Sequence, residues 1–153
     1  MARHATFTEA TAHNHQEHEA LRQDLAALQA ALDEVVCYAE VYANLAGAGR
    51  VCECGRGLLH HVPGHFAQEE TTLLAEVARV SAAAQAFVEE MKRQHVELQT
   101  QLEEFGTVIE QFQEATDLEE AVCRLKQKGE EFSRRMAAHM AAEERKVALL
   151  SVN

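Results

Sequence analysis

The sequence of 153 residues is poor in the residues that interrupt helices, with one proline and seven glycines. It also lacks alternating runs of valine, isoleucine and threonine, the pattern that is typical of β-strands. Alanine, leucine, glutamate and glutamine are plentiful, and these residues favour helix. The length suffices for one domain with its own buried core. We therefore expect residues 1–153 to form a single all-α domain.

Positive charge is also scarce, because 14 lysines and arginines stand against 25 aspartates and glutamates, for a net charge of −11. This balance argues against binding nucleic acid through its phosphates. No apolar run approaches the roughly 18 residues that a membrane-spanning helix needs. The first residues lack the apolar stretch of a secretory signal peptide. We expect a soluble, cytoplasmic protein with neither nucleic acid nor membrane as a partner.

The four cysteines do not have the spacing of a disulfide framework. Cys37 and Cys123 fall among apolar helical residues, which favours packing in the core. Cys52 and Cys54 form a Cys-x-Cys pair near an expected helix start. We interpret this pair as incidental, because Cys-x-Cys alone is not a metal-site pattern, and a redox pair or a metal clip is the alternative.

Four long segments repeat apolar residues at helical spacing. The first spans about residues 11–45, with a Gly-Ala-Gly stop just after it. The second spans about residues 52–78 and contains Pro63, where we expect a kink or a break. The third begins after Ser81, a candidate N-cap, and the fourth after a Thr-x-x-Glu capping box at 116–119. Because the connections are short, the sequence predicts an up-down-up-down antiparallel four-helix bundle.

Two segments share a histidine that is followed by glutamate four residues later. They are His65-Phe-Ala-Gln-Glu69-Glu70 and His139-Met-Ala-Ala-Glu143-Glu144. Four helical residues correspond to about 40° of rotation and about 6 Å of rise, so both side chains share one face. An imidazole nitrogen and a carboxylate oxygen placed in this way can hold one metal ion, or two adjacent ions with the carboxylate between them.

A second pair of segments begins at His18 and His95, and both read His-x-x-Leu-x-x-x-Leu. The interval from His18 to His65 is 47 residues, and that from His95 to His139 is 44 residues. The two halves therefore look like a degenerate repeat of a two-helix unit. Each histidine continues the apolar stripe of its helix, so we expect all four to face the interior of the bundle.

Four imidazoles and two carboxylates that face one interior can hold two metal ions, with two histidines on each ion and both carboxylates bridging. The candidate ligands are His18, His65, Glu69, His95, His139 and Glu143. Nitrogen and oxygen ligands without thiolate favour iron or manganese, and they do not exclude zinc. Histidines that merely pack as hydrogen-bonded core residues are the alternative. That alternative fits poorly, because two buried glutamates without a cation are strongly disfavoured.

Several neighbouring residues are less certain ligands. His61 lies one turn before His65 and either binds metal or lines the access to the site. His15 is a substitute ligand or lies at the solvent-exposed end of its helix. Glu70 and Glu144 are expected to be solvated or to hydrogen-bond the ligands, and Glu144 is also a less certain metal ligand.

With these residues in place, nearly the whole chain resembles the hemerythrin-like (HHE cation-binding) domain. The resemblance implies a non-haem di-iron centre with an oxo or hydroxo bridge and with Glu69 and Glu143 as bridging carboxylates. Oxygen-carrying hemerythrins have a second histidine one turn after the third-helix ligand, where this chain has Gln99. They also use an acid five residues after the last histidine, a spacing that Glu144 has and Glu143 does not. The chain is therefore similar to the His-His-x-x-x-Glu-His-His-x-x-x-Glu subset, which includes iron–sulfur cluster repair proteins and iron or oxygen sensors.

The resemblance implies a protein that reacts with or senses dioxygen, peroxide or nitric oxide in stress response or iron homeostasis. Its partner would be a small diatomic ligand or peroxide, and the sequence names no protein partner. The alternatives are a dioxygen-binding or storage module without turnover, an iron donor in iron–sulfur cluster repair, and a helical interaction domain without metal. Whether the protein is an enzyme stays open.

Overall fold

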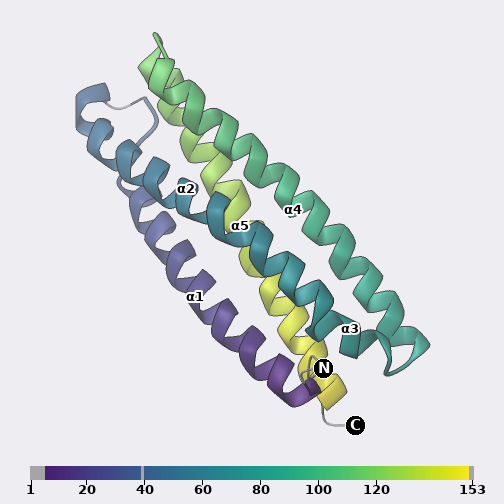
Figure 1. The fold of residues 1–153 in the computed structure, drawn as a ribbon. Helices are drawn as coiled ribbons and strands as arrows, with labels where there is room; N and C mark the ends of the chain where they lie inside the picture. Colours follow the sequence, from purple (N-terminus) through teal and green to yellow (C-terminus); the bar gives the residue numbers. More distant parts are fainter. Residues whose placement is uncertain (1–5, 39, 152–153) are drawn as a thin grey trace.

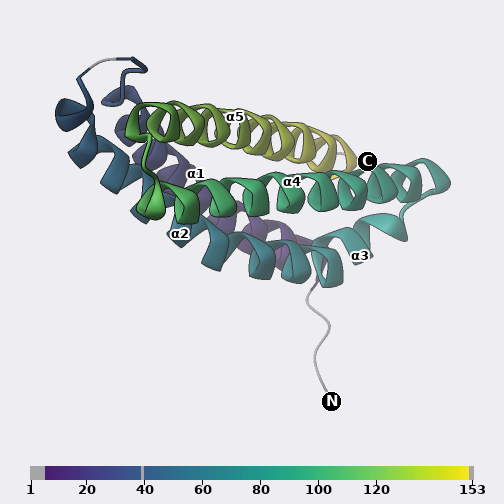
Figure 2. The same ribbon diagram turned by 90° about the horizontal axis from the view of Figure 1, so that it is seen from above.

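The computed structural model describes residues 6–38 and 40–151, and every regular element in these ranges is an α-helix. The helices are α1 (Phe7–Asp33), α2 (Val41–Thr71), α3 (Leu73–Ala78), α4 (Ala82–Glu114) and α5 (Leu118–Ser151). The four long helices run alternately up and down, and the short α3 joins α2 to α4 at one end (Figure 1). They pack in the ring order α1, α2, α4, α5, with α4 and α5 side by side in Figure 2. The predicted all-α antiparallel four-helix bundle is confirmed, with α3 added.

Two clusters of buried apolar residues fill the bundle at different heights. The larger cluster lies toward the α1–α2 connection and contains the fully buried rings of Phe66, Phe105 and Phe132. The smaller cluster gathers around α3 and includes Leu73 and Leu74. Burial of one such side chain stabilises the fold by about 1.5–3 kcal/mol, so these clusters hold the helices together. In the described part of the chain, no helix has an apolar stretch long enough to cross a membrane.

The first helix ends earlier than the sequence predicts. α1 stops at Asp33 rather than near residue 45, and α2 begins at Val41, so the expected Gly-Ala-Gly stop lies inside α2. Gly47 lies against the end of α1, where a Cβ atom would be 3.2 Å from Val35 Cγ2. The prediction was wrong because this glycine permits a close approach of two helices and does not end one.

Tertiary hydrogen bonds hold the α1–α2 connection in place. The side-chain amide of Asn44 accepts a hydrogen bond from the Val36 N–H at 3.1 Å and donates one to the Val36 carbonyl at 2.7 Å. The Lys126 ammonium of α5 donates to the carbonyl oxygens of Leu32 and Val35 at 3.1 and 2.5 Å. These bonds satisfy carbonyls that the end of α1 leaves without helical partners.

The second long segment is interrupted after Pro63 and not before it. α2 continues through Pro63, and the expected break lies instead at Thr72, which has φ −113° and ψ −87° between α2 and α3. The hydroxyls of Thr71 and Thr72 both donate to the carbonyl of Gln68, at 3.0 and 2.8 Å. Such bonds compete with the helical backbone pattern. Residues 65–69 therefore stay on one continuous helix.

The helix starts agree with the sequence in one case and differ in another. Ser81 accepts a hydrogen bond from the Ala84 N–H at 3.0 Å, so the predicted N-cap of α4 is confirmed. At the start of α5 the capping side chain is Asp117, which accepts from the Glu120 N–H at 3.1 Å. The predicted N-cap at Thr116 was wrong by one residue, because aspartate is a better N-cap residue than threonine.

The cysteines are all free thiols, and their surroundings fit packing. Cys37 lies half-buried in the α1–α2 connection, outside the helix in which we expected it, and contacts Cys123 of α5. Burial and the Cys123 thiol raise the pKa of Cys37 to about 11. Burial also raises the pKa of Cys52 and of Cys54. Raised thiol pKa values are typical of unreactive structural cysteines.

Gly55 lies where α2 passes close to α4, and its replacement tests this packing. A Cβ atom at Gly55 would lie 2.4 Å from Ile109 Cδ1 and 2.9 Å from Phe105 Cε1, both buried. We expect Gly55→Ala to destabilise the fold by about 1–3 kcal/mol, because the overpacked core must shift. Thermal unfolding followed by circular dichroism measures the change.

Gly57 on the same helix is the matched control, because an added Cβ atom meets nothing within 4 Å. Gly57→Ala should stabilise the fold by about 0.5–1 kcal/mol, the usual gain from alanine inside a helix. Equal shifts of the melting temperature in the two variants would contradict the close α2–α4 approach.

Candidate metal centre

Six buried polar side chains form one layer across the bundle, between the two apolar clusters. Each long helix contributes one histidine, and α2 and α5 each add a glutamate. The six are His18, His65, Glu69, His95, His139 and Glu143. Their side chains are at most 3% exposed. The structure thus brings together all six residues that the sequence marks as candidate ligands.

The six side chains form two overlapping groups, in each of which the potential ligand atoms lie within 4.8 Å of one another. One group is His18, His65 and Glu69, and the other is Glu69, His95, His139 and Glu143. The histidines of the first group come from α1 and α2, and those of the second from α4 and α5. Each half of the sequence repeat therefore supplies the histidines of one group, and Glu69 belongs to both.

Several atoms of the layer lie close together without forming hydrogen bonds. Glu69 Oε2 is 3.1 Å from His65 Nε2, and Glu69 Oε1 is 2.9 Å from His95 Nε2. Yet His65 Nε2, Glu69 Oε1 and Glu143 Oε2 are fully buried and have no hydrogen-bond partner. Each such atom costs about 1–3 kcal/mol when it is left unsatisfied. A cation among these atoms would satisfy them, so the residues fit a metal centre.

The imidazoles of His95 and His139 give a second reason to expect a cation. Their Nε2 atoms face each other at 3.1 Å. The Nδ1 atom of His95 bonds to a Glu70 oxygen, and that of His139 bonds to the Gln94 carbonyl oxygen, both at 2.8 Å. Since both partners are acceptors, each Nδ1 carries the proton. Where neither Nε2 atom carries a second proton, the two facing lone pairs repel each other, and a bound metal would relieve this contact.

The ring of Phe66 closes the layer on the side of the larger apolar cluster. It stacks on the His95 imidazole, with ring centroids 4.0 Å apart and planes inclined by 9°. It also meets His139 edge-on at 5.8 Å. An apolar wall of this kind excludes water and strengthens electrostatic interactions inside the layer.

The two carboxyls of the layer have opposite pKa shifts. Burial acts to raise the pKa of Glu69, but the hydrogen bond with His18 and the close imidazoles of His65 and His95 outweigh it and hold this pKa well below its usual range. Burial and the nearby Glu69 carboxylate raise the pKa of Glu143 to about 10. Burial and the neighbouring His95 lower the pKa of His139 to about 4. A metal ion that binds here would therefore meet neutral imidazole and displace a proton from Glu143.

Glu144, predicted as a less certain ligand, lies on the outer side of the layer. One of its oxygens is 3.0 Å from His18 Nδ1, and the other accepts from Arg22 at 2.5 Å. Partial burial opposes ionisation, but Arg22 and His18 lower the pKa of Glu144. Glu144 is in neither group of potential ligand atoms. It orients His18, which is the hydrogen-bonding role that the sequence also suggested.

The structure does not bring His61 into either group. Its ring is half-exposed, with Nε2 3.1 Å from Glu17 Oε2 and Nδ1 3.2 Å from Asp24 Oδ2. Burial would lower the pKa of His61, but these two carboxylates raise it. His15 is exposed and is likewise in neither group.

Three residues that lie against the candidate ligands were not predicted from the sequence. Asn14 is buried and donates to Glu143 Oε1 at 2.9 Å. Gln94 accepts from His139, and Glu17 lies near His65 Nδ1 at 3.8 Å. All three are polar residues one position or one turn before a candidate ligand. That placement was visible, but only the packing of the helices decides which of them reach inward.

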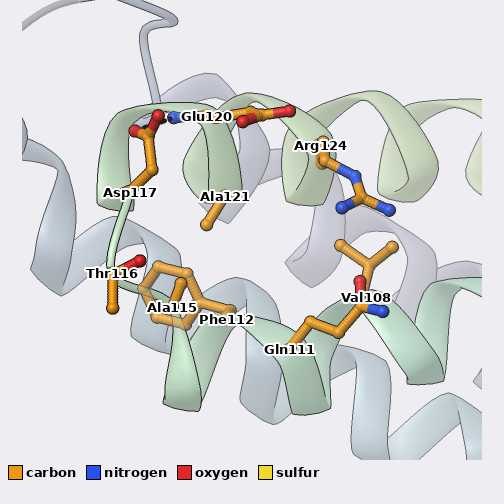
Figure 3. A pocket seen from close by; sticks show the side chains of 9 residues that line it. All are labelled: Val108, Gln111, Phe112, Ala115, Thr116, Asp117, Glu120, Ala121 and Arg124. Carbon is orange, nitrogen blue, oxygen red and sulfur yellow. Dashed lines mark hydrogen bonds between the residues drawn. The ribbon is translucent and has the colours of Figure 1, made fainter.

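A cavity of about 480 Å³ between α4 and α5 reaches the layer from outside, and His139 and Gln94 are among its lining residues. A different cavity of about 240 Å³ lies at the α4–α5 connection. Figure 3 shows Val108 of α4 facing Arg124 of α5 across it, and Phe112 lying opposite Ala121. Val108 is 13 residues beyond His95, or about 20 Å along the helix. The cavity in Figure 3 is therefore separate from the layer.

The family model of the Hemerythrin HHE cation binding domain matches residues 9–149 of the chain. This range contains all six residues of the buried layer and nearly all of the four long helices. No curated protein and no solved structure matches the chain.

The raised pKa of Glu143 predicts a pH dependence of the metal-free fold. The folded protein keeps a proton on Glu143 that the unfolded chain releases above its ordinary pKa of 4.5. The contribution of Glu143 to the free energy of unfolding is therefore greatest below pH 4.5, and it falls as the pH rises toward about 10. The lowered pKa of His139 has the opposite effect, since stability from that group rises with pH up to its ordinary pKa of 6.5. Urea unfolding with a chelator present should therefore show stability falling from about pH 7 to about pH 9, by on the order of 1 kcal/mol per pH unit.

Glu143→Gln mimics the protonated acid, so the metal-free variant should lose most of this slope. Glu110→Gln, at an exposed position of α4, is the control and should unfold as the wild type does. A wild-type slope that persists in Glu143→Gln would show that Glu143 does not hold the proton.

Proposed function

The chain belongs to the Hemerythrin HHE cation binding domain family, and we propose that it is a non-haem di-iron protein that reacts with or senses dioxygen, peroxide or nitric oxide. The observation that carries this proposal is the position of Glu69, which belongs to both groups of potential ligand atoms. A shared carboxylate is what two adjacent metal ions require. A single-ion site would need only one of the groups.

The proposed ligands of one iron are His18 and His65, and those of the other are His95 and His139. Glu69 would hold both ions, because it belongs to both groups, and Glu143 would complete the second position. Glu143 also lies near the first position, since its Oε1 is 3.5 Å from His18 Nε2. Iron, when bound, supplies redox chemistry and open coordination positions for a small ligand. The chain's own part is to present the four imidazoles, to release a proton from Glu143 and to keep water out.

The donor set supports iron over a structural zinc ion. In the described residues both groups contain only imidazole and carboxylate, and no thiolate takes part. Such mixed nitrogen and oxygen ligation suits iron and manganese, whereas structural zinc sites commonly use cysteine. Six side chains also leave open positions on two ions that each prefer five or six ligands. Open positions support reaction with an external ligand.

A dioxygen store without turnover and an iron donor for cluster repair are the remaining candidates. Gln99 stands where oxygen carriers of the resembled family have a further histidine, which disfavours reversible oxygen carriage. No observation in the described residues favours a particular protein partner. The ligand class that the buried layer suits is a small diatomic molecule or peroxide, as in stress response or iron homeostasis.

The iron content of ligand variants tests the centre. We expect wild-type protein, loaded with ferrous iron and desalted, to retain about two irons per chain. His65→Ala and His139→Ala each remove the imidazole of one position and should lower the retained iron by at least about half. His13→Ala is the control, because His13 is exposed and bonds only to Gln68 among the described contacts. Equal iron retention in all three variants would refute the ligand assignment.

Reactivity is tested separately on the loaded protein. Ferrous protein mixed with dioxygen, hydrogen peroxide or a nitric oxide donor should change its optical spectrum with at least one of them. A spectrum that recovers when dioxygen is removed would identify a store, and turnover of peroxide would identify an enzyme. A loaded protein inert to all three would refute the proposed reactivity and leave the metal centre standing.

A further inference from the structure

Each half of the chain supplies a carboxylate that bonds to a histidine of the other half in the buried layer. His18 of the first half bonds through Nδ1 to Glu144 of the second half at 3.0 Å. His95 of the second half bonds through Nδ1 to Glu70 of the first half at 2.8 Å. Glu70 follows Glu69, and Glu144 follows Glu143, so the two bonds occupy equivalent places in the repeat. The geometry of these two bonds is symmetric, although Arg22 also bonds to Glu144.

The other two histidines break this symmetry. His65 Nδ1 faces the Glu17 Oε2 atom at 3.8 Å, an ion-pair distance, and the same oxygen lies 3.1 Å from His61 Nε2. His139 Nδ1 instead bonds to the Gln94 side-chain oxygen at 2.8 Å. Glu17 directly precedes His18, and Gln94 directly precedes His95. The same position of the repeat therefore carries an acid in one half and an uncharged amide in the other.

A hydrogen bond to the surface residue Glu90 fixes the orientation of the Gln94 side chain. Its Nε2 atom donates to Glu90 Oε1 at 3.0 Å, and Glu90 is paired with Arg93. Since a carboxylate only accepts, the NH₂ group of Gln94 must point to Glu90 and its oxygen to His139. His139 must then donate from Nδ1, which leaves Nε2 as the lone pair that faces the layer. The contacts thus select one tautomer of His139.

From these contacts we infer that Gln94 is the positioning residue of His139, and that the difference between Glu17 and Gln94 makes the two metal positions unequal. This inference rests on the proposed di-iron function. A carboxylate behind an imidazole makes the ring a stronger donor, whereas an amide orients the ring and adds no charge. His139 is accordingly the only one of the four candidate histidines whose outer partner in the described structure is neutral.

Gln94 separates His139 Nδ1 from water in the cavity between α4 and α5. Glu90, Gln94 and His139 all line it, together with arginines from both helices. Without the Gln94 side chain, Nδ1 of His139 would face this cavity, where water can donate as well as accept. The ring would then be free to adopt either tautomer.

The first test uses metal-free protein and nitrogen NMR of the imidazoles. In the wild type, His139 should show a protonated Nδ1 and an unprotonated Nε2. Gln94→Leu should turn this pattern into a mixture of tautomers, while Gln111→Leu, at an exposed position of the same helix, should leave it unchanged. A His139 pattern that is identical in Gln94→Leu and in the wild type would refute the positioning role.

The second test measures the affinity of each position for ferrous iron, by anaerobic competition with a chelator. Gln94→Leu should weaken one binding step by about 10–100-fold and leave the other unchanged. Gln94→Glu, made together with Glu90→Gln so that an amide can still donate at this contact, should strengthen that same step, and Glu17→Gln should weaken the other one. The step that responds to the Gln94 variants is assigned to the His139 position, and the step that responds to Glu17→Gln is assigned to the His65 position.

The outcomes separate this inference from the proposed function. Equal changes in both steps, or no change in either after the exchange of acid and amide, would refute the inequality of the positions. Wild-type protein that binds no ferrous iron would refute the proposed function, and the tautomer experiment on metal-free protein would still decide the role of Gln94. Gln94→Glu preserves the side-chain volume, so it remains informative if Gln94→Leu does not fold.

Discussion

The buried carboxylate of Glu69 is the point on which the rest of the site depends. It lies among imidazoles from three other positions, and no solvent reaches it. An ionised carboxylate in an apolar interior is tolerated only with compensating partners, so the four helices must bring their histidines to one height. The depressed pKa of Glu69 and the raised pKa of Glu143 are two results of this crowding. A bound cation would satisfy the Glu69 and Glu143 oxygens that hydrogen bonds leave without partners.

The apolar clusters above and below the layer explain how the bundle tolerates it. Phe66, Phe105 and Phe132 lie on one side, and Leu73 and Leu74 of α3 lie on the other. Because these clusters supply the favourable burial, the polar layer can be optimised for binding and not for stability. The short α3 belongs to this arrangement, since it covers the end of the bundle that lies nearest to the layer.

The helices and the six convergent side chains could be predicted because both follow from local periodicity. A histidine that continues an apolar stripe must face inward, whatever the neighbouring helices are. The end of α1 could not be predicted, because it depends on Lys126 and Asn44, which belong to other helices. The break expected at Pro63 lies instead at Thr72, where the hydroxyls of Thr71 and Thr72 bond to the Gln68 carbonyl. The outer contacts made by Asn14 and Gln94 depend on helix rotation, which periodicity gives only coarsely.

The stacking of Phe66 on His95 has a consequence for the speed of metal exchange. A ring clamped by a parallel aromatic face and tied at its outer nitrogen to Glu70 cannot swing away by a simple change of rotamer. Loss of an ion from that position would require the stacked ring to leave with its helix, which is a local opening of the bundle. Such openings are rare and slow in comparison with side-chain motion. The rate at which a bound ion leaves would then be limited by the transient separation of α2 from α4. Even an ion of low affinity could therefore have a long residence time.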